Sequence, residues 1–414
     1  MTTELKNSPA NVTTTGHTQS NKTMIQSANV ARERWTHGDV VTLKRGGSRE
    51  QFISARRKGS DELSIFDDFP PTSASVVAQM VFGGCGFHDA ARARMGGADW
   101  PMLWLQGDVC PGKHVAGISA FALDGQTVRR VQLADRIVGS AWSDADADYC
   151  FLAGVLPADF SASRGAQTIS CFEQIEVALQ KIGMDFSHVA RTWFYLDQLL
   201  NWYGEFNVAR TKFFQSRSVF DRLVPASTGI GAKNPFGVAL AAGALAVRPK
   251  NNRVQIREII SPLQCPATNY RSSFSRAVEM AFSDHRTLMV SGTASIAPDG
   301  KTVFADSTVK QIHLTLDVVE AILKSRGMDW QNTVRAIGYF QDIRALPVFE
   351  DCCRERGIPP LPLAPAHATV CRNDLWFEME LDVLSLTPMQ ELVETSLDSV
   401  NVNSEDEADS LIAI

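Results

Sequence analysis

Two stretches of the chain repeat the same order of apolar and polar positions. In the later stretch, four apolar residues recur at the spacing of an amphipathic helix: Ile312, Leu316, Val319 and Leu323. Gly327 follows where a helix C-cap favours positive φ, and the apolar run Thr333–Gln341 is typical of a strand. Residues 173–198 align with residues 317–342 without a gap, 144 positions apart. A repeat this long exceeds the roughly 20–50 residues of a solenoid unit, so it predicts two copies of one α/β unit.

The second copy has enough pattern to predict its elements. Strands are expected at 274–282, 287–296, 333–341 and 374–383, and helices near 308–326 and 345–356. Asp299-Gly300 is a hairpin signal after the second of these strands. The first copy follows the same order and ends in 225–247. We therefore expect an α+β fold of two tandem domains, each a mixed sheet with helices on one face, plus an N-terminal extension.

The predicted boundaries follow from these elements and from composition. They are a disordered polar leader (1–35), an N-terminal segment packing on the first domain (36–130), a first domain (131–250), a connection (249–265), a second domain (265–385) and a disordered acidic tail (386–414).

Composition and charge narrow the class of protein. With 44% hydrophobic and 21% charged residues among 414, the chain is an ordinary globular protein. No apolar run approaches the ~18–20 residues of a membrane span, and the first thirty residues lack the apolar core of a secretory signal, so we expect a cytoplasmic location. The tail holds seven acidic and no basic residues against a net charge of −6, which leaves the body near neutral. Attraction to nucleic acid or to an anionic membrane is not expected.

Metal and cofactor motifs are missing from the sequence. The eight cysteines are scattered without a C-x-x-C pair, so they are expected to be reduced and mostly buried rather than zinc ligands. Gly229 and Gly231 give G-x-G without the third glycine of a dinucleotide fingerprint. We therefore expect neither a metal nor a cofactor.

The last predicted strand carries the strongest candidate chemistry. In CRNDLWFEMELDV, apolar residues on one face alternate with polar residues that include Glu378, Glu380 and Asp382. The polar face could be the solvated side of a half-buried edge strand. Alternatively it lines a cleft, where Trp376 would raise the pKa of a carboxyl towards use as a general acid.

The sequence also allows two interpretations of each of the other candidate residues. Gly292 could be a bulge or a place where a ligand approaches the backbone closely, and Cys371 could be an inert core thiol. Arg276 is either a surface residue or a clamp for a carboxylate. Tyr270 and Tyr339 have the same ambiguity.

Several motifs resemble known families. The second copy resembles the Rid/YjgF family in its VSGTASI strand (290–296), its Arg335–Tyr339 strand and its terminal FEME. Four further stretches are similar to the chorismatases, two-domain relatives that hydrolyse chorismate. They are SDADADYCFLAGV (143–155), ARTWFYL (190–196), LVPASTGIGA (223–232) and CRNDLWFEME (371–380), and the resemblance spans about 240 residues.

The resemblance implies roles for individual residues. Glu378 matches the general acid of chorismatases, and Cys371 with Gly292 matches the type that forms 3-hydroxybenzoate. Substrate binding would fall to Arg372, Arg276, Gly292, Tyr270 and Tyr339. His367 stands where Rid imine deaminases carry a substrate-binding arginine, which argues against that chemistry.

The expected activity is cleavage of the enol ether of chorismate to pyruvate and a (hydroxy)benzoate-type product, with 3-hydroxybenzoate favoured. The alternatives are a Rid-type hydrolase or deaminase of another small carboxylate or imine, and a non-catalytic small-molecule binder. The only expected partner is the small-molecule substrate. The protein could be a monomer or a homo-oligomer such as a trimer.

Overall fold

The computed structural model describes residues 29–270 and 272–386, whose strands form a twelve-stranded and a six-stranded sheet. We divide these strands into three units of six. The N-terminal unit holds β1 (Asn29–Trp35), β2 (Gly38–Arg45), β3 (Ser48–Arg56), β4 (Ser75–Gly83), β5 (Met102–Gly107) and β6 (Val115–Asp124). The middle unit holds β7 (Arg129–Leu133), β8 (Arg136–Ser143), β9 (Ala147–Val155), β10 (Val189–Leu196), β11 (Ala226–Lys233) and β12 (Leu240–Pro249). The C-terminal unit holds β13 (Gln255–Ile259), β14 (Ala277–Ala281), β15 (Arg286–Ala294), β16 (Thr333–Phe340), β17 (Leu363–His367) and β18 (Phe377–Ser385).

All three units have the same topology. Their strand orders are β1-β2-β3-β6-β4-β5, β7-β8-β9-β12-β10-β11 and β13-β14-β15-β18-β16-β17. In each unit the last pair is parallel and the other pairs are antiparallel. A register irregularity also recurs in the same place: at Val76/Ala78, Val189/Arg191 and Thr333/Arg335. Because the irregularity falls at the same place in each unit, it shows which residue of one unit corresponds to which residue of the other two.

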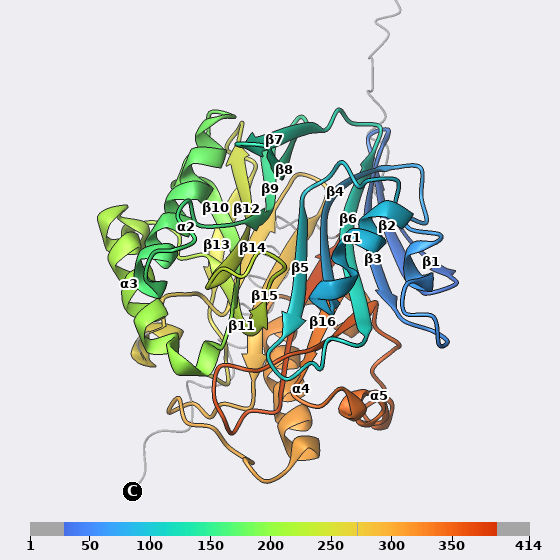
Figure 1. The fold of residues 1–414 in the computed structure, drawn as a ribbon, viewed down its shortest axis with the longest axis vertical. Helices are drawn as coiled ribbons and strands as arrows, with labels where there is room; N and C mark the ends of the chain where they lie inside the picture. The colour runs from blue at the N-terminus through green and yellow to red at the C-terminus, as the bar shows by residue number, and fades with distance from the viewer. Residues whose placement is uncertain (1–28, 271, 387–414) are drawn as a thin grey trace, which may run out of the picture.

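Helices cover the outer faces of the middle and C-terminal units (Figure 1). They are α2 (Arg164–Gln180), α3 (Tyr203–Ser216), α4 (Thr308–Lys324) and α5 (Leu346–Glu355), and the N-terminal unit has α1 (His88–Arg94). Ser163 and Ser307 cap α2 and α4 through their side chains, and Gly183 and Gly327 adopt φ of 75° and 64° after them. The α+β class is therefore confirmed. Among the described residues, no helix is both long and apolar enough to cross a bilayer.

The N-terminal third departs most from the prediction. The segment predicted only to pack on the first domain is a complete six-stranded unit, and its strand β1 lies within the predicted leader. Strand β13 lies in the predicted connection. Both are edge strands with mostly exposed or half-buried side chains, so their sequences lack the apolar alternation that marks a strand. The predictions for residues 1–28 and 387–414 fall outside the described residues.

The three units share a central core. Phe82, Tyr195 and Tyr339 occupy matched positions on β4, β10 and β16, and all three are nearly or fully buried. The hydroxyl oxygens of Tyr195 and Tyr339 lie 3.0 Å apart. The Phe82 ring centroid lies 6.3 Å and 5.9 Å from those of the two tyrosines. Matched residues therefore meet, as they would around a pseudo-threefold axis.

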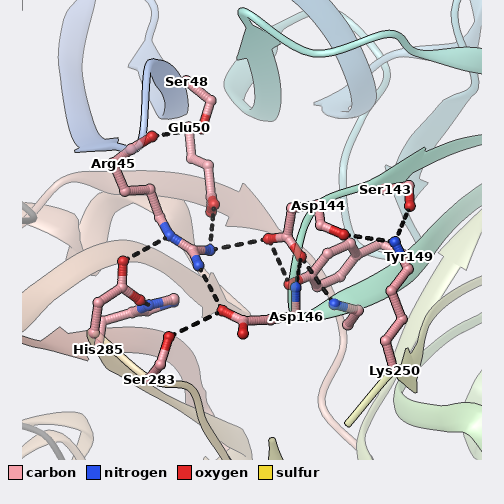
Figure 2. Close-up of polar contacts among 12 residues, drawn as sticks. Arg45, Ser48, Glu50, Ser143, Asp144, Asp146, Tyr149, Lys250, Ser283 and His285 are labelled. Atoms are coloured by element: carbon pink, nitrogen blue, oxygen red, sulfur yellow. Dashed lines mark hydrogen bonds and ion pairs between the residues drawn. The ribbon is translucent and has the colours of Figure 1, made fainter. Parts of the chain in front are cut away.

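Arg45 connects the three units at another part of this core (Figure 2). This residue ends β2 of the N-terminal unit and is largely buried. Its guanidinium pairs with Asp144 and Asp146 of the middle unit at 3.2 and 3.1 Å, and with Asp284 of the C-terminal unit at 3.0 Å. Glu50 of its own unit lies 3.4 Å away. Four carboxylates thus share this guanidinium, and Asp284 also lies 2.7 Å from Nδ1 of His285.

Candidate active site

Strand β18 carries Glu378, the predicted acid. From its sequence alone, this strand could be a solvated edge strand or could line a cleft. It lies in the middle of its sheet, between β15 and β16, and every residue in it is buried. Glu378, Glu380 and Asp382 are exposed by 5%, 0% and 4%. The solvated edge-strand interpretation is therefore wrong: the polar face is covered by the neighbouring unit, which sequence periodicity within one strand cannot reveal.

Glu378 faces a cavity of about 190 Å³ between the middle and C-terminal units. A single water needs only about 10–15 Å³ measured in this way, so the cavity can hold a small organic molecule. Five of the seven predicted site residues line it: Gly292, Arg276, Cys371, Arg372 and Glu378. The other lining residues are Tyr203, Gly204, Asn207, Arg210, Ser227, Gly229, Ser272, Phe274, Ala294 and Ile296.

The carboxyl group of Glu378 is suited to hold a proton at neutral pH. Burial and the neighbouring charge of Glu380 raise its pKa to about 8, although Arg191 and Arg276 act in the opposite direction. A carboxylic acid with this pKa is mostly protonated at pH 7 and can still donate its proton. This is the property required of a general acid.

Glu380, two residues along the same strand, is held in the opposite state. Its carboxylate accepts from Arg191 and Trp193 of the middle unit, both at 2.9 Å, and from Arg335 at 2.5 Å. Burial alone would raise its pKa, but Arg335 and Arg191 lower it below the ordinary value. The two glutamates are therefore pushed apart in pKa, and of the two Glu378 is the one suited to hold a proton at neutral pH.

Gly292 leaves room for the acid. A Cβ atom at this position would lie 2.0 Å from Oε1 of Glu378, so any side chain here would displace the carboxyl. The Gly292 amide donates to Oγ1 of Thr228 on β11 at 3.0 Å, which links the two units beside the cavity. Gly292 lies at a register irregularity of β15, between Val290 and Thr293, so the bulge interpretation is confirmed, and the group that approaches it here is the carboxyl of Glu378. Close approach of a ligand stays a prediction.

Three arginines give the cavity positive charge. Arg276 is 3% exposed and donates from Nε and Nη2 to the carbonyl oxygen of Cys265 at 3.0 and 2.9 Å. Arg372 is half-buried and donates to Thr302 at 3.3 Å. Arg210, on α3 of the middle unit, is 1% exposed, and its Cζ lies 5.7 Å from the centroid of the Phe274 ring. Guanidinium groups in these places can bind carboxylates.

Cys371 forms part of the wall next to the acid. Burial raises the pKa of its thiol to about 12, with a further contribution from Glu378. The thiol therefore stays protonated at neutral pH and lacks the thiolate needed for nucleophilic attack. A protonated thiol here contributes shape and weak polarity to the wall of the cavity.

Two of the predicted binding residues, Tyr339 and Tyr270, are not among the described residues that line the cavity. Tyr339 lies in the central core with its hydroxyl against Tyr195. The side chain of Tyr270 lies outside the described part of the chain. Trp376, predicted to raise the pKa of the acid, also does not line the cavity. Burial between two units and the charge of Glu380 have that effect instead.

Sequence reasoning missed the contribution of α3. Tyr203, Asn207 and Arg210 come from the middle unit and reach a cavity whose acid belongs to the C-terminal unit. The sequence held no signal for α3, but it held one for a buried carboxylate. Arg191 and Arg335 align in the repeat, and an arginine buried in a strand at both places requires a buried anion. That anion is Glu380.

Comparison with known proteins identifies the fold and shows which family the chain is similar to. The chain superposes on a solved structure of chorismatase with a TM-score of 0.59 at 17% identity, over 81% of this chain and 98% of that one. The protein therefore has the chorismatase fold. The family model described as "Chorismatase FkbO/Hyg5-like, N-terminal" matches residues 129–246, essentially the middle unit. A 3-hydroxybenzoate synthase of Streptomyces hygroscopicus is 27% identical over 265 residues, covering 57% of this chain and 74% of the relative. The resemblance to chorismatases predicted from the motifs is therefore confirmed: the middle unit matches the family model, and the curated relative is a 3-hydroxybenzoate synthase.

Proposed function

We propose that this protein cleaves the enol ether of chorismate, releasing pyruvate, and that its ring product is 3-hydroxybenzoate. The observation that carries the proposal is a carboxyl with a pKa of about 8, Glu378, facing a cavity lined by three arginines. The match of the middle unit to the chorismatase family model and the name of the curated relative support the choice of substrate and product.

The chemistry begins with proton delivery to carbon. Glu378 donates its proton to the methylene carbon of the enolpyruvyl group, and the electron pair of the C=C bond forms the new C–H bond. The resulting oxocarbenium ion is stabilised by the ether oxygen, and the Glu378 carboxylate left behind is an anion beside it. Capture of the cation by water or by a ring hydroxyl then leads to loss of pyruvate.

The route of capture decides the ring product. Pyruvate plus 3-hydroxybenzoate together contain all the atoms of chorismate, so this outcome consumes no net water. Pyruvate plus a dihydroxycyclohexadiene carboxylate contains one further water molecule. We assign the choice to the wall formed by Gly292 and Cys371, which lies directly against the acid.

The arginines account for substrate binding. Chorismate carries two carboxylates, and guanidinium groups can bind each of them through two parallel hydrogen bonds. Arg276 and Arg372 were predicted for this task, and Arg210 is a third candidate from the other side of the cavity. Binding across the two units would place the enol ether beside Glu378.

Purified protein incubated with chorismate tests the proposal. Pyruvate is followed through a lactate dehydrogenase assay, and the ring product is identified by chromatography. We expect pyruvate and 3-hydroxybenzoate in equal amounts, with Glu378→Gln inactive and the exposed helix residue Glu173→Gln unaffected. Failure to release pyruvate would rule the function out. Ammonia release from a small imine would instead favour a Rid-type deaminase.

We also propose that the three units are copies of one Rid-like domain. The middle unit (129–249) and the C-terminal unit (255–385) would be the tandem pair predicted from sequence, and the N-terminal unit would be a third copy without the long first helix. Identical strand order, identical pairing senses and a shared register irregularity support this.

A further inference from the structure

A second cleft occupies the position that matches the Glu378 cavity. It lies between the N-terminal and middle units, has a volume of about 160 Å³ and is lined by His88, Arg92, Ala98, Trp100, Met102, Trp104, Asp135, Arg136, Ile137, Gly154 and Phe236. The strand registers match Met102 and Trp104 to Ser227 and Gly229 of the Glu378 cavity. Gly154 matches Gly292, because both fall at the register shift of their strand.

This second cleft lacks a general acid. Glu378 pairs with Tyr339, and the residue that pairs with the matched Tyr195 is Ala241. Asp135 is the one carboxylate among the described residues lining the cleft, and it is exposed on a turn. The cleft can therefore bind a molecule without protonating it from a buried carboxyl.

Arg136 gives this cleft a recognition element for anions. Its Cζ lies 5.2 Å from the centroid of the Phe236 ring. Burial lowers its pKa, with the charge of Asp135 acting against this. Within the described ranges, no carboxylate lies within 4.0 Å of this guanidinium and none of its N–H groups donates a hydrogen bond. A partly desolvated guanidinium without a carboxylate partner gains from binding one.

The remaining walls are aromatic. His88, only 14% exposed in its side chain, meets Trp104 and Phe236 edge-on at 5.5 and 6.1 Å between ring centroids. Trp100 lines the same space and is held by a 2.7 Å hydrogen bond to Gln79. Arg92 donates to the carbonyl of Gly97, so its charge is directed to the loop after α1. The cleft thus combines aromatic rings with two arginines, of which Arg136 lies over the ring of Phe236.

We propose that this cleft is a second, non-catalytic binding site for a planar aromatic carboxylate. The carboxylate would accept two hydrogen bonds from Arg136, and the ring would pack against Trp104 and Phe236. The site does not depend on the activity proposed above, because none of its residues lines the Glu378 cavity.

Calorimetric titration with benzoate at low ionic strength tests the proposal. Wild-type protein should bind benzoate at a site that Arg136→Gln weakens at least about tenfold. Arg276→Gln should leave that site intact, which separates it from any binding in the Glu378 cavity. Benzylamine, with the opposite charge, should not bind there. The urea unfolding midpoint of Arg136→Gln should match that of the wild type, which shows that the variant is folded whether or not the protein turns over chorismate.

A second readout places the ligand. Benzoate should change the tryptophan fluorescence of the wild type, and Trp104→Phe should reduce that change. The proposal is wrong if benzoate does not bind the wild type at millimolar concentration, or if Arg136→Gln titrates like the wild type.

Discussion

Replacing Glu378 by Gln removes the ionisable proton while keeping the shape of the side chain. Two consequences follow from the structure. Turnover should fall by roughly 10²–10⁴, because an amide cannot deliver a proton to carbon. In addition, the variant should be more stable than the wild type at neutral and alkaline pH, because it no longer has to hold a buried carboxylate.

The size of the stability change follows from the pKa. Burial, and then Glu380, raise the pKa of Glu378 from 4.5 to about 8. Each pKa unit corresponds to about 1.4 kcal/mol, so ionising this group costs the folded protein about 5 kcal/mol relative to the unfolded chain. The folded state binds the proton more tightly, so its stability is full below pH 4.5 and is lost as the pH rises to about 8. That loss is comparable with the whole unfolding free energy of many proteins, roughly 5–15 kcal/mol.

The assay is urea unfolding of the wild type and Glu378→Gln at several pH values. The unfolding free energy of the variant minus that of the wild type should grow by roughly 3–4 kcal/mol between pH 5 and pH 8 and then level off. In parallel, kcat of the wild type should decline as the pH rises through about 8, where the acid loses its proton. Glu173→Gln, an exposed substitution on α2, is the matched control and should show neither effect.

Two results would refute this reasoning. A Glu378→Gln variant with wild-type turnover would place the acid elsewhere. A stability difference that stays the same from pH 5 to pH 8 would mean that the Glu378 carboxyl titrates normally and is not held protonated by its surroundings.

Two further predictions concern the wall of the cavity and the junction of the units. Gly292→Ala with Cys371→Ala should lower turnover, because the new Cβ would lie 2.0 Å from Oε1 of Glu378, and should shift the product towards the dihydroxycyclohexadiene carboxylate. An unchanged product ratio on chromatography, with turnover retained, would contradict this. Arg45→Ala should lower the unfolding free energy by about 3–5 kcal/mol, since it leaves buried carboxylates uncompensated. Arg34→Ala, at an exposed ion pair, should change it by less than about 1 kcal/mol in the same urea titration.

The parts of the fold predicted from sequence were those with strong local periodicity. The helix at 308–324 and the strand at 333–340 combine an apolar stripe, a stop and an apolar run. The N-terminal unit gave no such signal, because residues 57–74 contain a 3-10 turn, Ser64–Phe66, where the other units have a long helix. Its strands are real, but their pairing is fixed by contacts with each other and not by a pattern within each strand.

The residues of the candidate site also fall into those that a local motif predicts and those that only packing between units brings to the site. Glu378, Gly292 and Cys371 were reachable because they lie in recognisable motifs of one unit. Arg210 was not, because α3 reaches the cavity only through the packing of the middle unit on the C-terminal unit. Burial of Glu380 was missed for the same physical reason: its arginine and tryptophan partners at Arg191 and Trp193 are almost 190 positions away in the sequence.

At two matched positions, only the C-terminal unit carries a glutamate. The residues matched to Glu378 are Gly117 and Ala241, and those matched to Glu380 are Ser119 and Gly243.

These positions lie near the shared core, where Arg335 reaches both Glu380 of its own unit and Ser119 of the N-terminal unit. Glu380 lies against Arg191 of the middle unit at 2.9 Å and Arg335 of its own unit at 2.5 Å, so its charge is compensated from two units. A single chain with three different units can place one glutamate against arginines from two units. These arginines lower the pKa of Glu380, whereas burial and the charge of Glu380 raise the pKa of Glu378.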